Sequence, residues 1–208
     1  ISSYSNEEVG EGEEEVKVAG FEVEASNDGD IALRSIKLRF DPTGNSGSTH
    51  LDDYISGVKV WLGDEEIGSA DVDDFNEEDN DTYTKTITVR DAVVKSDETE
   101  KIYITVDAVN SFDSSDIQST NDSWTVTVDS IRFEDGSGVV TTETDEIPAD
   151  TLRWDSTGDG VTMDFVSFSD SADTKLKFSK ASDTPEEGLV TVDDEDDTDN
   201  VSLLKGKI

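Results

Sequence analysis

The sequence predicts an all-β protein, with an Ig-like β-sandwich followed by a smaller β domain. Apolar residues recur at every second position in one segment after another, which is the period of a half-buried strand. Stretches rich in Gly, Ser, Asn and Asp separate these segments and are typical of turns. The intervals leave little room for helices, so the pattern favours packed sheets.

The stretch from Leu51 to Ala70 shows this pattern most clearly. Its first part has three alternating apolar residues, which are Val58, Val60 and Leu62. A tight turn at Gly63-Asp64 follows, and a shorter strand that carries Ile67 returns from it. The stretch therefore predicts a β-hairpin on one sheet of a sandwich.

Residues 1–15 are polar and acidic and are expected to form an N-terminal arm. A strand is predicted from Val16, but its apolar residues change face along it. They form two pairs on opposite sides of the strand, which are Val16 with Val18 and Phe21 with Val23. The Ala19-Gly20 pair predicts a β-bulge at the switch.

The run from Ile31 to Phe40 repeats this change of face, with the switch at Arg34-Ser35. Strands of this kind often cross between the two sheets of a sandwich, so both runs are expected at such a crossing. Asp41-Pro42 ends the second run, and a Gly/Ser/Thr loop leads from there to the hairpin.

Three more alternating segments follow an acidic loop from Asp71 to Asp81. They are TYTKTITV, EKIYITV and WTVTVDSIRF, which begin at Thr82, Glu100 and Trp124. Trp124 lies among apolar strand residues and is predicted to belong to the core. About seven strands separated by turns over residues 16–140 predict an Ig-like sandwich.

A domain boundary is predicted between Asp135 and Asp150, where Gly136-Ser137-Gly138 and Ile147-Pro148 interrupt the strand pattern. Residues 150–208 are then expected to form a smaller β domain with the strands VTMDF, TKLKF, LVTV and VSLLKGKI. So small a set of strands makes a marginal core and leaves unpaired edges. The domain is therefore predicted to be completed by a strand of a neighbouring subunit.

The two ends of the chain are alike. Residues 11–23 and 193–208 each hold an acidic run, an alternating apolar pair and a closing apolar residue. Coincidence between two acidic-led strands is one explanation of the match; the others are that the next copy of a repeat begins there, or that the terminal strand of one subunit completes its neighbour by strand exchange. Under strand exchange, the contact residues are Val16, Val18, Phe21, Val23, Val201, Leu203, Leu204 and Ile208.

With 52 acidic and 16 basic residues, the chain has a formal net charge of -36. This charge repels nucleic acid and anionic membranes, so neither is an expected partner, and no segment predicts direct insertion into a membrane. The charge is tolerable in molar salt, where the Debye length is about 3 Å, or with divalent cations among the carboxylates. A halophilic habitat is favoured, and the regular strand pattern argues against the alternative, a disordered acidic chain.

The chain has no Cys, which excludes disulfides and thiolate metal sites. The sequence contains no signal peptide or membrane span, and its first residue, Ile1, indicates a mature product or a fragment of a longer protein. Three N-x-S/T sequons would accept glycans in a secreted chain, although such short motifs also arise by chance. Their asparagines are Asn80, Asn121 and Asn200.

The order ISGVKVWLGDEEIGSA, TKTITV and VVKSDETEKIYITVDAVNS resembles the Ig-like repeats of microbial surface-layer and other large cell-surface proteins. The resemblance covers residues 16–135 and implies an extracellular structural or adhesive role without catalysis. It carries over no functional residues, because such domains share no active site. The acidity and the short second domain depart from an ordinary repeat and leave the mode of assembly open.

Aspartate-rich loops are the candidate metal sites, with Ca²⁺ as the candidate cofactor. Asp155 and Asp159 flank a Gly-rich backbone, but the loop lacks the full pattern and the distal Glu of an EF-hand, so a solvated turn is the alternative. A denser cluster, for which a solvated charge run is the alternative, contains Asp193, Asp194 and Asp196. If two acidic loops met in space, their combined negative charge would strengthen the case for a Ca²⁺ site.

No catalytic constellation stands out, and the chain is not predicted to be an enzyme. Its only histidine, His50, lies in a Gly/Ser/Thr loop and is expected to be exposed rather than to act as a general base. Exposed Trp61 and Trp154 side by side would instead indicate a sugar-binding face.

These observations predict a structural subunit of an extracellular polymer, either a filament or a surface layer, in a salty environment. Copies of the chain would join by strand addition, in which main-chain hydrogen bonds and alternating apolar side chains supply the contact. The alternative is an adhesin module of a larger cell-surface protein that binds glycans or another ligand. A third hypothesis, an acidic secreted hydrolase, requires a carboxylate pair in a cleft.

Overall fold

The structure is a computed structural model that describes residues 7–42, 47–113, 115–117, 122–144 and 160–166, together with the backbone of 179–180 and 206–207. The chain divides into two compact units, Ile1–Ala172 and Asp173–Ile208, which are described separately. In the described part of the first unit, the regular secondary structure is almost all β-strand, which confirms the predicted all-β class.

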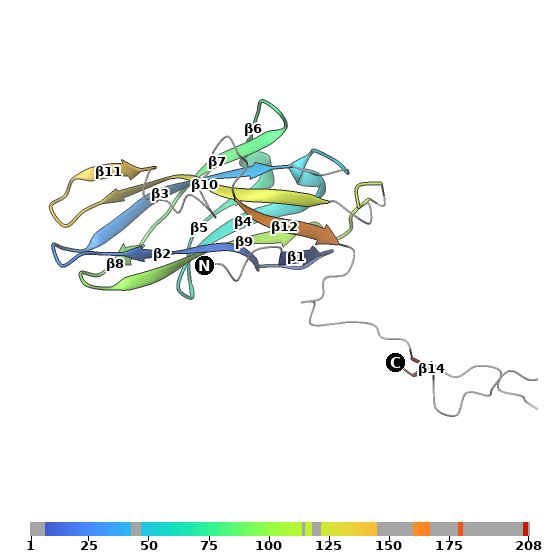
Figure 1. The fold of residues 1–208 in the computed structure, drawn as a ribbon, viewed down its shortest axis with the longest axis horizontal. Coiled ribbons are helices and arrows are strands. Elements are labelled where there is room, and N and C mark those ends of the chain that lie inside the picture. Colours follow the sequence, from blue (N-terminus) through green and yellow to red (C-terminus); the bar gives the residue numbers. More distant parts are fainter. Residues whose placement is uncertain are drawn as a thin grey trace, which may run out of the picture. The chain divides into compact units, whose positions relative to one another are not determined.

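Two sheets pack face to face in the first unit as a β-sandwich (Figure 1). Within the described residues, one sheet has eight strands, which are β1 (Glu7–Gly10), β3 (Ile31–Asp41), β6 (Asn76–Glu78), β7 (Thr82–Thr88), β8 (Val93–Val94), β10 (Ser123–Glu134), β11 (Val140–Glu143) and β12 (Val161–Val166). The described part of the other sheet has four strands, which are β2 (Val16–Glu24), β4 (Ile55–Leu62), β5 (Glu65–Asp71) and β9 (Thr99–Ala108). Two short 3₁₀ helices, Leu51–Asp53 and Val72–Asp74, flank the β4–β5 hairpin.

The first sheet is organised around β3 and β10, which pair antiparallel over nine residue pairs. Its strand order is β1-β12-β10-β3-β7-β6, with β11 beside the second half of β10 and β8 beside the start of β3. The second sheet has the order β2-β9-β4-β5. Among the described strands of both sheets, only β1 and β12 pair in parallel. Alternate side chains of the central strands point between the sheets, so the period-two pattern in the sequence marks the core.

The β4–β5 hairpin has the bounds that the sequence predicts. Leu62 pairs with Glu65 across the two-residue turn, and Gly63 adopts a φ of +60°. A positive φ at the first turn position is what the common two-residue hairpin turns require, and glycine adopts it without strain. The side chain of Ile67 is buried on the returning strand, so it joins the core as expected.

Both predicted β-bulges are present. The register of β2 with β9 shifts between Lys17 and Ala19, and the register of β3 with β10 skips Arg34. Neither strand crosses between the sheets, however, because β2 lies entirely in the second sheet and β3 entirely in the first. A bulge inserts one extra residue, which returns the apolar side chains to the core face while the strand stays in its sheet.

Aromatic side chains form a large part of the core. The ring of Tyr54 lies 5.8 Å from that of Trp124 and 4.8 Å from that of Phe165, measured between centroids. All three side chains are fully buried, which confirms the prediction for Trp124. The Tyr54 hydroxyl lies 3.0 Å from the backbone oxygen of Asp116 and 3.2 Å from that of Ser48, and donating its proton there satisfies its polar end.

The structure corrects two details of the predicted domain organisation. Residues 7–10, expected in the arm, form β1, and the side chain of Val9 is fully buried. Residues 161–166, expected in the second domain, form β12 between β1 and β10 of the first sheet. Alternation shows which side chains face a core, but it does not show which distant strand lies alongside. The pairings of β12 with β1 and with β10 could therefore not be predicted from the sequence pattern.

The second unit has one described pairing, which is antiparallel between β13 (Ser179–Lys180) and β14 (Gly206–Lys207). β14 lies within the predicted strand VSLLKGKI, and β13 directly follows the predicted strand TKLKF. The proposed completion of a smaller domain by a neighbouring subunit stays a prediction.

Candidate functional site

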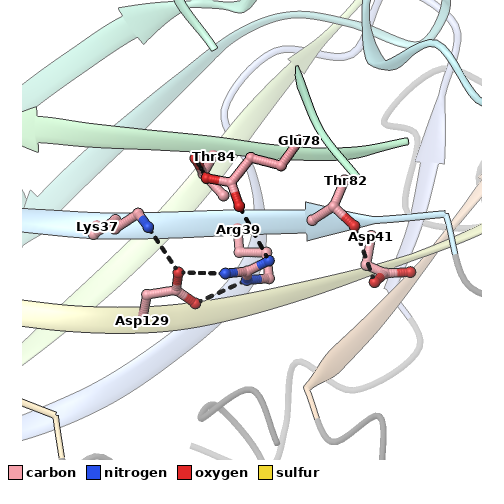
Figure 2. A network of polar contacts seen from close by, with 7 residues as sticks. All are labelled: Lys37, Arg39, Asp41, Glu78, Thr82, Thr84 and Asp129. Atoms are coloured by element: carbon pink, nitrogen blue, oxygen red, sulfur yellow. Dashed lines mark hydrogen bonds and ion pairs between the residues drawn. The ribbon is translucent and has the colours of Figure 1, made fainter. Parts of the chain in front are cut away.

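A network of charged side chains lies on the outer face of the first sheet, where β3 meets β10 (Figure 2). The Arg39 Nε donates to Asp129 Oδ1 at 3.0 Å, and its Nη2 donates to Asp129 Oδ2 at 2.9 Å. Lys37 Nζ lies 3.2 Å from the same Asp129 Oδ2. The two parallel hydrogen bonds make this the strong, bidentate form of an arginine–carboxylate pair, and they fasten β3 to β10.

The same network extends to the outer strand β6 through Glu78. Glu78 Oε2 lies 3.8 Å from Arg39 Nη1, and Glu78 Oε1 accepts a hydrogen bond from Thr84 Oγ1 at 2.7 Å. At the start of β7, Thr82 Oγ1 donates to Oδ2 of Asp41, the last residue of β3, at 3.4 Å. Figure 2 shows these side chains side by side, and together they tie the β6–β7 hairpin to β3.

The electrostatics of this network favour a structural role. The side chains of Arg39 and Asp129 are only 16% and 13% exposed. The hydrogen bonds to Asp129 raise the pKa of Arg39 above its ordinary value, although burial acts in the opposite direction. Since the guanidinium already faces two carboxylates, it does not offer a site for a phosphate or an acidic ligand.

An open hollow of about 620 Å³ adjoins the network. Its lining consists of Arg39, Asp41, Glu78, Asp79, Asn80 and Thr82. Small-molecule sites of this size are usually lined by apolar and aromatic side chains with a few polar groups. None of these six residues is apolar or aromatic, so the hollow does not fit a typical small-molecule site.

A second ion-pair cluster fixes the turn between β1 and β2. Lys59 Nζ lies 3.0 Å from Glu15 Oε1 and 3.0 Å from Asp107 Oδ2, and the Glu15 backbone N–H donates to Asp107 Oδ1 at 2.7 Å. Burial alone would lower the pKa of Lys59, but the hydrogen bonds and charges of its two partners outweigh burial and raise it. These contacts hold Glu15 at a φ of +57°, which is unusual for a residue other than glycine.

The outer edge of the second sheet at β5 is covered. The Arg90 backbone N–H donates to the Ile67 oxygen at 2.9 Å. Gly68 lies so close to the end of β7 that a Cβ at this position would be 2.8 Å from the Thr88 oxygen. The end of β7 and the residues after it therefore close this edge of the sandwich.

The edge at β6 is short and charged. Its three residues, Asn76, Glu77 and Glu78, are all exposed. Short outer strands with charged side chains are a common means by which proteins avoid pairing edge to edge with other chains. β6 is therefore a poor acceptor for an added strand.

The edge at β11 is of a different kind. Val139 and Val140 are 56% and 44% exposed, and they are two of the three large apolar side chains exposed in the described residues. Val140, Thr141 and Thr142 are β-branched and uncharged, a composition that favours strand pairing. β10 pairs with one side of β11, and no other strand that the structure describes pairs with the second side.

The predicted strand-exchange residues fall in two groups. Val16, Val18, Phe21 and Val23 belong to β2, where Val18 and Phe21 are buried and the other two are half-buried. β2 pairs with β9 over eight residue pairs and is thus an integral strand of its own sheet. The second group, Val201, Leu203, Leu204 and Ile208, lies outside the described residues.

The predicted calcium ligands also lie outside the described residues, and they are Asp155, Asp159, Asp193, Asp194 and Asp196. In the part of the chain that the structure describes, no group of three or more His, Asp or Glu side chains is arranged to hold a metal ion. The loop from Asp71 to Asp81 is described, and most of it consists of a 3₁₀ turn and β6.

Among the predicted glycan acceptors, Asn80 is exposed in the turn between β6 and β7, with a φ of +64°. Asn121 and Asn200 lie outside the described residues. His50 is exposed in a loop, as expected. Trp61 is half-buried, and its Nε1 donates to Thr105 Oγ1 at 2.9 Å, whereas Trp154 is not among the described residues, so the paired-tryptophan hypothesis stays a prediction.

β11 is not among the predicted strands, because the predicted domain boundary lies at Gly136-Ser137-Gly138, directly before it. The signal that would have identified this strand is a run of four β-branched residues from Val139 to Thr142. The pairing of Arg39 with Asp129 was also missed, because charged side chains at outward strand positions carry no information about partners 90 residues away.

In comparisons with known proteins, no family model, curated protein or solved structure matches the chain. Within the described residues, no helix has the length and apolar character of a membrane span.

Proposed function

We propose that this protein is a structural subunit of an extracellular polymer, a filament or a surface layer, in which copies of the chain join by strand addition. The observation that carries the proposal is the edge of β11. In a chain with a net charge of -36, this edge exposes an uncharged Val-Val-Thr-Thr run. An exposed strand edge can pair its main-chain N–H and C=O groups with a strand of another chain.

Three of the other edges support β11 as the acceptor. β5 is closed by the end of β7, and β6 is three residues long and acidic. β2 carries the exposed charges of Lys17, Glu22 and Glu24 and contains a bulge, both of which weaken an edge as a template. β2 is also a poor donor, because leaving its sheet would break its pairing with β9.

The charge of the chain supports a salty habitat for this polymer. Copies with a net charge of -36 repel one another at low ionic strength. Molar salt reduces the Debye length to about 3 Å and thereby allows close contact between acidic surfaces. Calcium bound among carboxylates would reduce the repulsion in the same way.

The proposal is tested by measuring particle size with light scattering from low to molar salt, with and without Ca²⁺. We expect long assemblies that grow with salt. Deleting residues 201–208 should abolish them while circular dichroism still reports a folded β-protein. A folded monomer under every condition would contradict the polymer function.

A further inference from the structure

We infer that β11 of one copy pairs antiparallel with β11 of a second copy, about a two-fold axis at Thr141. The inference rests on the proposed function, because it names the partner that the β11 edge takes in the polymer. In this pairing each β11 is the acceptor strand and the added strand at the same time, so the first sheets of two copies join into one sheet.

The hydrogen bonds of the turn before β11 determine which main-chain groups of the strand face outward. The Asp135 N–H donates to the Val139 oxygen at 3.0 Å, so these two residues form a hydrogen-bonded pair. In an antiparallel ladder such pairs alternate with non-hydrogen-bonded pairs. Val140 and Thr142 occupy the non-hydrogen-bonded positions, and their N–H and C=O groups therefore point away from β10. No described residue bonds to these outward groups.

The outward groups of β11 are complementary to a second copy of the same strand. With the axis at Thr141, Val140 lies opposite Thr142 of the second copy, and the two exchange both of their main-chain hydrogen bonds. An axis at Thr142 would instead pair Val140 with Thr144, whose N–H already donates to the neighbouring carboxylate at 2.9 Å. An axis at Val140 would require Gly138, which lies in the turn with a φ of +83°. The axis at Thr141 therefore uses the strand best.

The distribution of charge favours the same register. The uncharged residues 139–142 lie at the centre of the contact, so no like charges stand directly opposite each other. Glu143 faces Val139 of the second copy, and Asp135 lies one strand further away, opposite that valine. Molar salt, with a Debye length of about 3 Å, screens the repulsion between these two carboxylates. The pairing should therefore strengthen as salt is added.

The other edges of the two sheets are poorer partners for β11. β1 and β6 each carry two glutamates, and β2 carries exposed charges. The β5 edge is covered, and β8 is two residues long. A contact of β11 with itself is two-fold symmetric and closes as a dimer. Because a dimer presents every other surface twice, contacts too weak to join single copies can join dimers into longer assemblies.

Disulfide cross-linking of the full-length chain tests the position of the axis, and the chain has no Cys of its own that would compete. A non-hydrogen-bonded pair at the axis brings the two Cα atoms to about 4.5 Å, which a disulfide can span. Thr141→Cys, oxidised in molar salt, should therefore become mostly disulfide-linked dimer. The matched control is Asn76→Cys on the exposed strand β6, which should stay mostly unlinked. Equal cross-linking of both variants would overturn the inference.

A second set of variants tests the register. Val140→Cys mixed with Thr142→Cys should give dimers that contain one copy of each, because residues of a hydrogen-bonded pair lie about 5.5 Å apart. Thr142→Cys alone should cross-link less, because its two copies lie on a diagonal, about 7–8 Å apart. More efficient linking of Thr142→Cys alone than of the mixture would overturn the axis at Thr141.

Removal of the nearest carboxylate tests the electrostatic part of the inference. Glu143→Gln should lower the dissociation constant of the dimer about threefold at low salt, and the difference should shrink in molar salt. Sedimentation equilibrium at several salt concentrations gives both constants. A dissociation constant that does not change at low salt would contradict the placement of Glu143 beside the contact.

The outcomes separate this inference from the proposed function. A dimer that links through Thr141→Cys but never grows further would keep the inference and contradict the polymer. Long assemblies in which Thr141→Cys stays unlinked would overturn the inference and leave the polymer standing. A protein that stays monomeric from low to molar salt would overturn both.

Discussion

β6 and β11 are both short outer strands of the first sheet, and a tight turn joins each of them to a longer neighbour. β6 carries two glutamates, and one of them, Glu78, contacts Arg39 of β3 and Thr84 of β7. β11 carries Val140 and two threonines before its single acidic residue, Glu143. The same sheet therefore has one outer strand that is protected by charge, β6, and another that exposes an uncharged run, β11.

This difference shows how an acidic protein can direct its contacts. Repulsion acts over the whole surface, so an edge that lacks charge is also a place where two copies approach at lower cost. The contact of Glu78 with Arg39 links β6 to β3, while the turn before β11 depends on one aspartate, Asp135.

The largest effect on stability is expected from Arg39→Met. This change removes both hydrogen bonds to Asp129 and the contact with Glu78, and it leaves the largely buried Asp129 with only Lys37 as a cationic partner. Hydrogen bonds to charged groups contribute about 2 kcal/mol, so the free energy of unfolding should fall by about that amount. Urea denaturation with the midpoint and slope fitted together gives this value.

Arg34→Met is the matched control, because Arg34 pairs with Glu134 on the same sheet but its side chain is 51% exposed. Exposed ion pairs contribute about 0.2–1 kcal/mol. A loss for Arg34→Met as large as that for Arg39→Met would show that burial of the Arg39 pair does not strengthen it.

A smaller and local effect is expected from Asp135→Ala. The Asp135 carboxylate accepts hydrogen bonds from the backbone N–H groups of Ser137 and Val139 and from the Ser137 hydroxyl. Without them, the β10–β11 turn should open more often, and the amides of β11 should exchange with solvent faster while those of β3 keep their protection. Asp135→Asn retains a side-chain oxygen and should show a weaker effect. Unchanged exchange in both variants would contradict this account of the turn.

The smallest effect concerns pH. The hydrogen bonds from Ser137 and Val139 lower the pKa of Asp135 below its ordinary value. A carboxylate with a lowered pKa in the folded state stabilises that state above the unfolded-state pKa, about 3.9, and this contribution is lost as pH falls through the lowered folded-state value. NMR titration of the Asp135 carboxyl carbon should therefore show a midpoint below the ordinary range. An ordinary midpoint would mean that the turn hydrogen bonds do not persist in solution.

Local patterns in the sequence were sufficient to predict the β4–β5 hairpin and the strands that contain bulges. The β4–β5 hairpin follows from the turn glycine Gly63, and the bulges of β2 and β3 follow from the change of face near Ala19 and Arg34. In each case the physical cause lies within a few residues, so alternation and turn chemistry are enough.

Features that depend on distant partners were not predictable in this way. Val9 is a single apolar residue after two glutamates, and only its pairing with Phe165 makes its segment a strand. The covering of the β5 edge depends on the approach of Gly68 to Thr88, and the pinning of β6 depends on Arg39 meeting Glu78. These contacts join parts of the chain that the sequence pattern treats as independent.

The most direct test of the central claim compares one substitution on each edge. Val140→Lys on β11 and Asn76→Lys on β6 change the charge equally, and both positions are exposed. Light scattering at molar salt should show that Val140→Lys stays monomeric while Asn76→Lys assembles like the unmodified protein, with similar urea midpoints for all three. Assembly of the Val140→Lys variant, or loss of assembly in Asn76→Lys alone, would contradict the claim that copies join at β11.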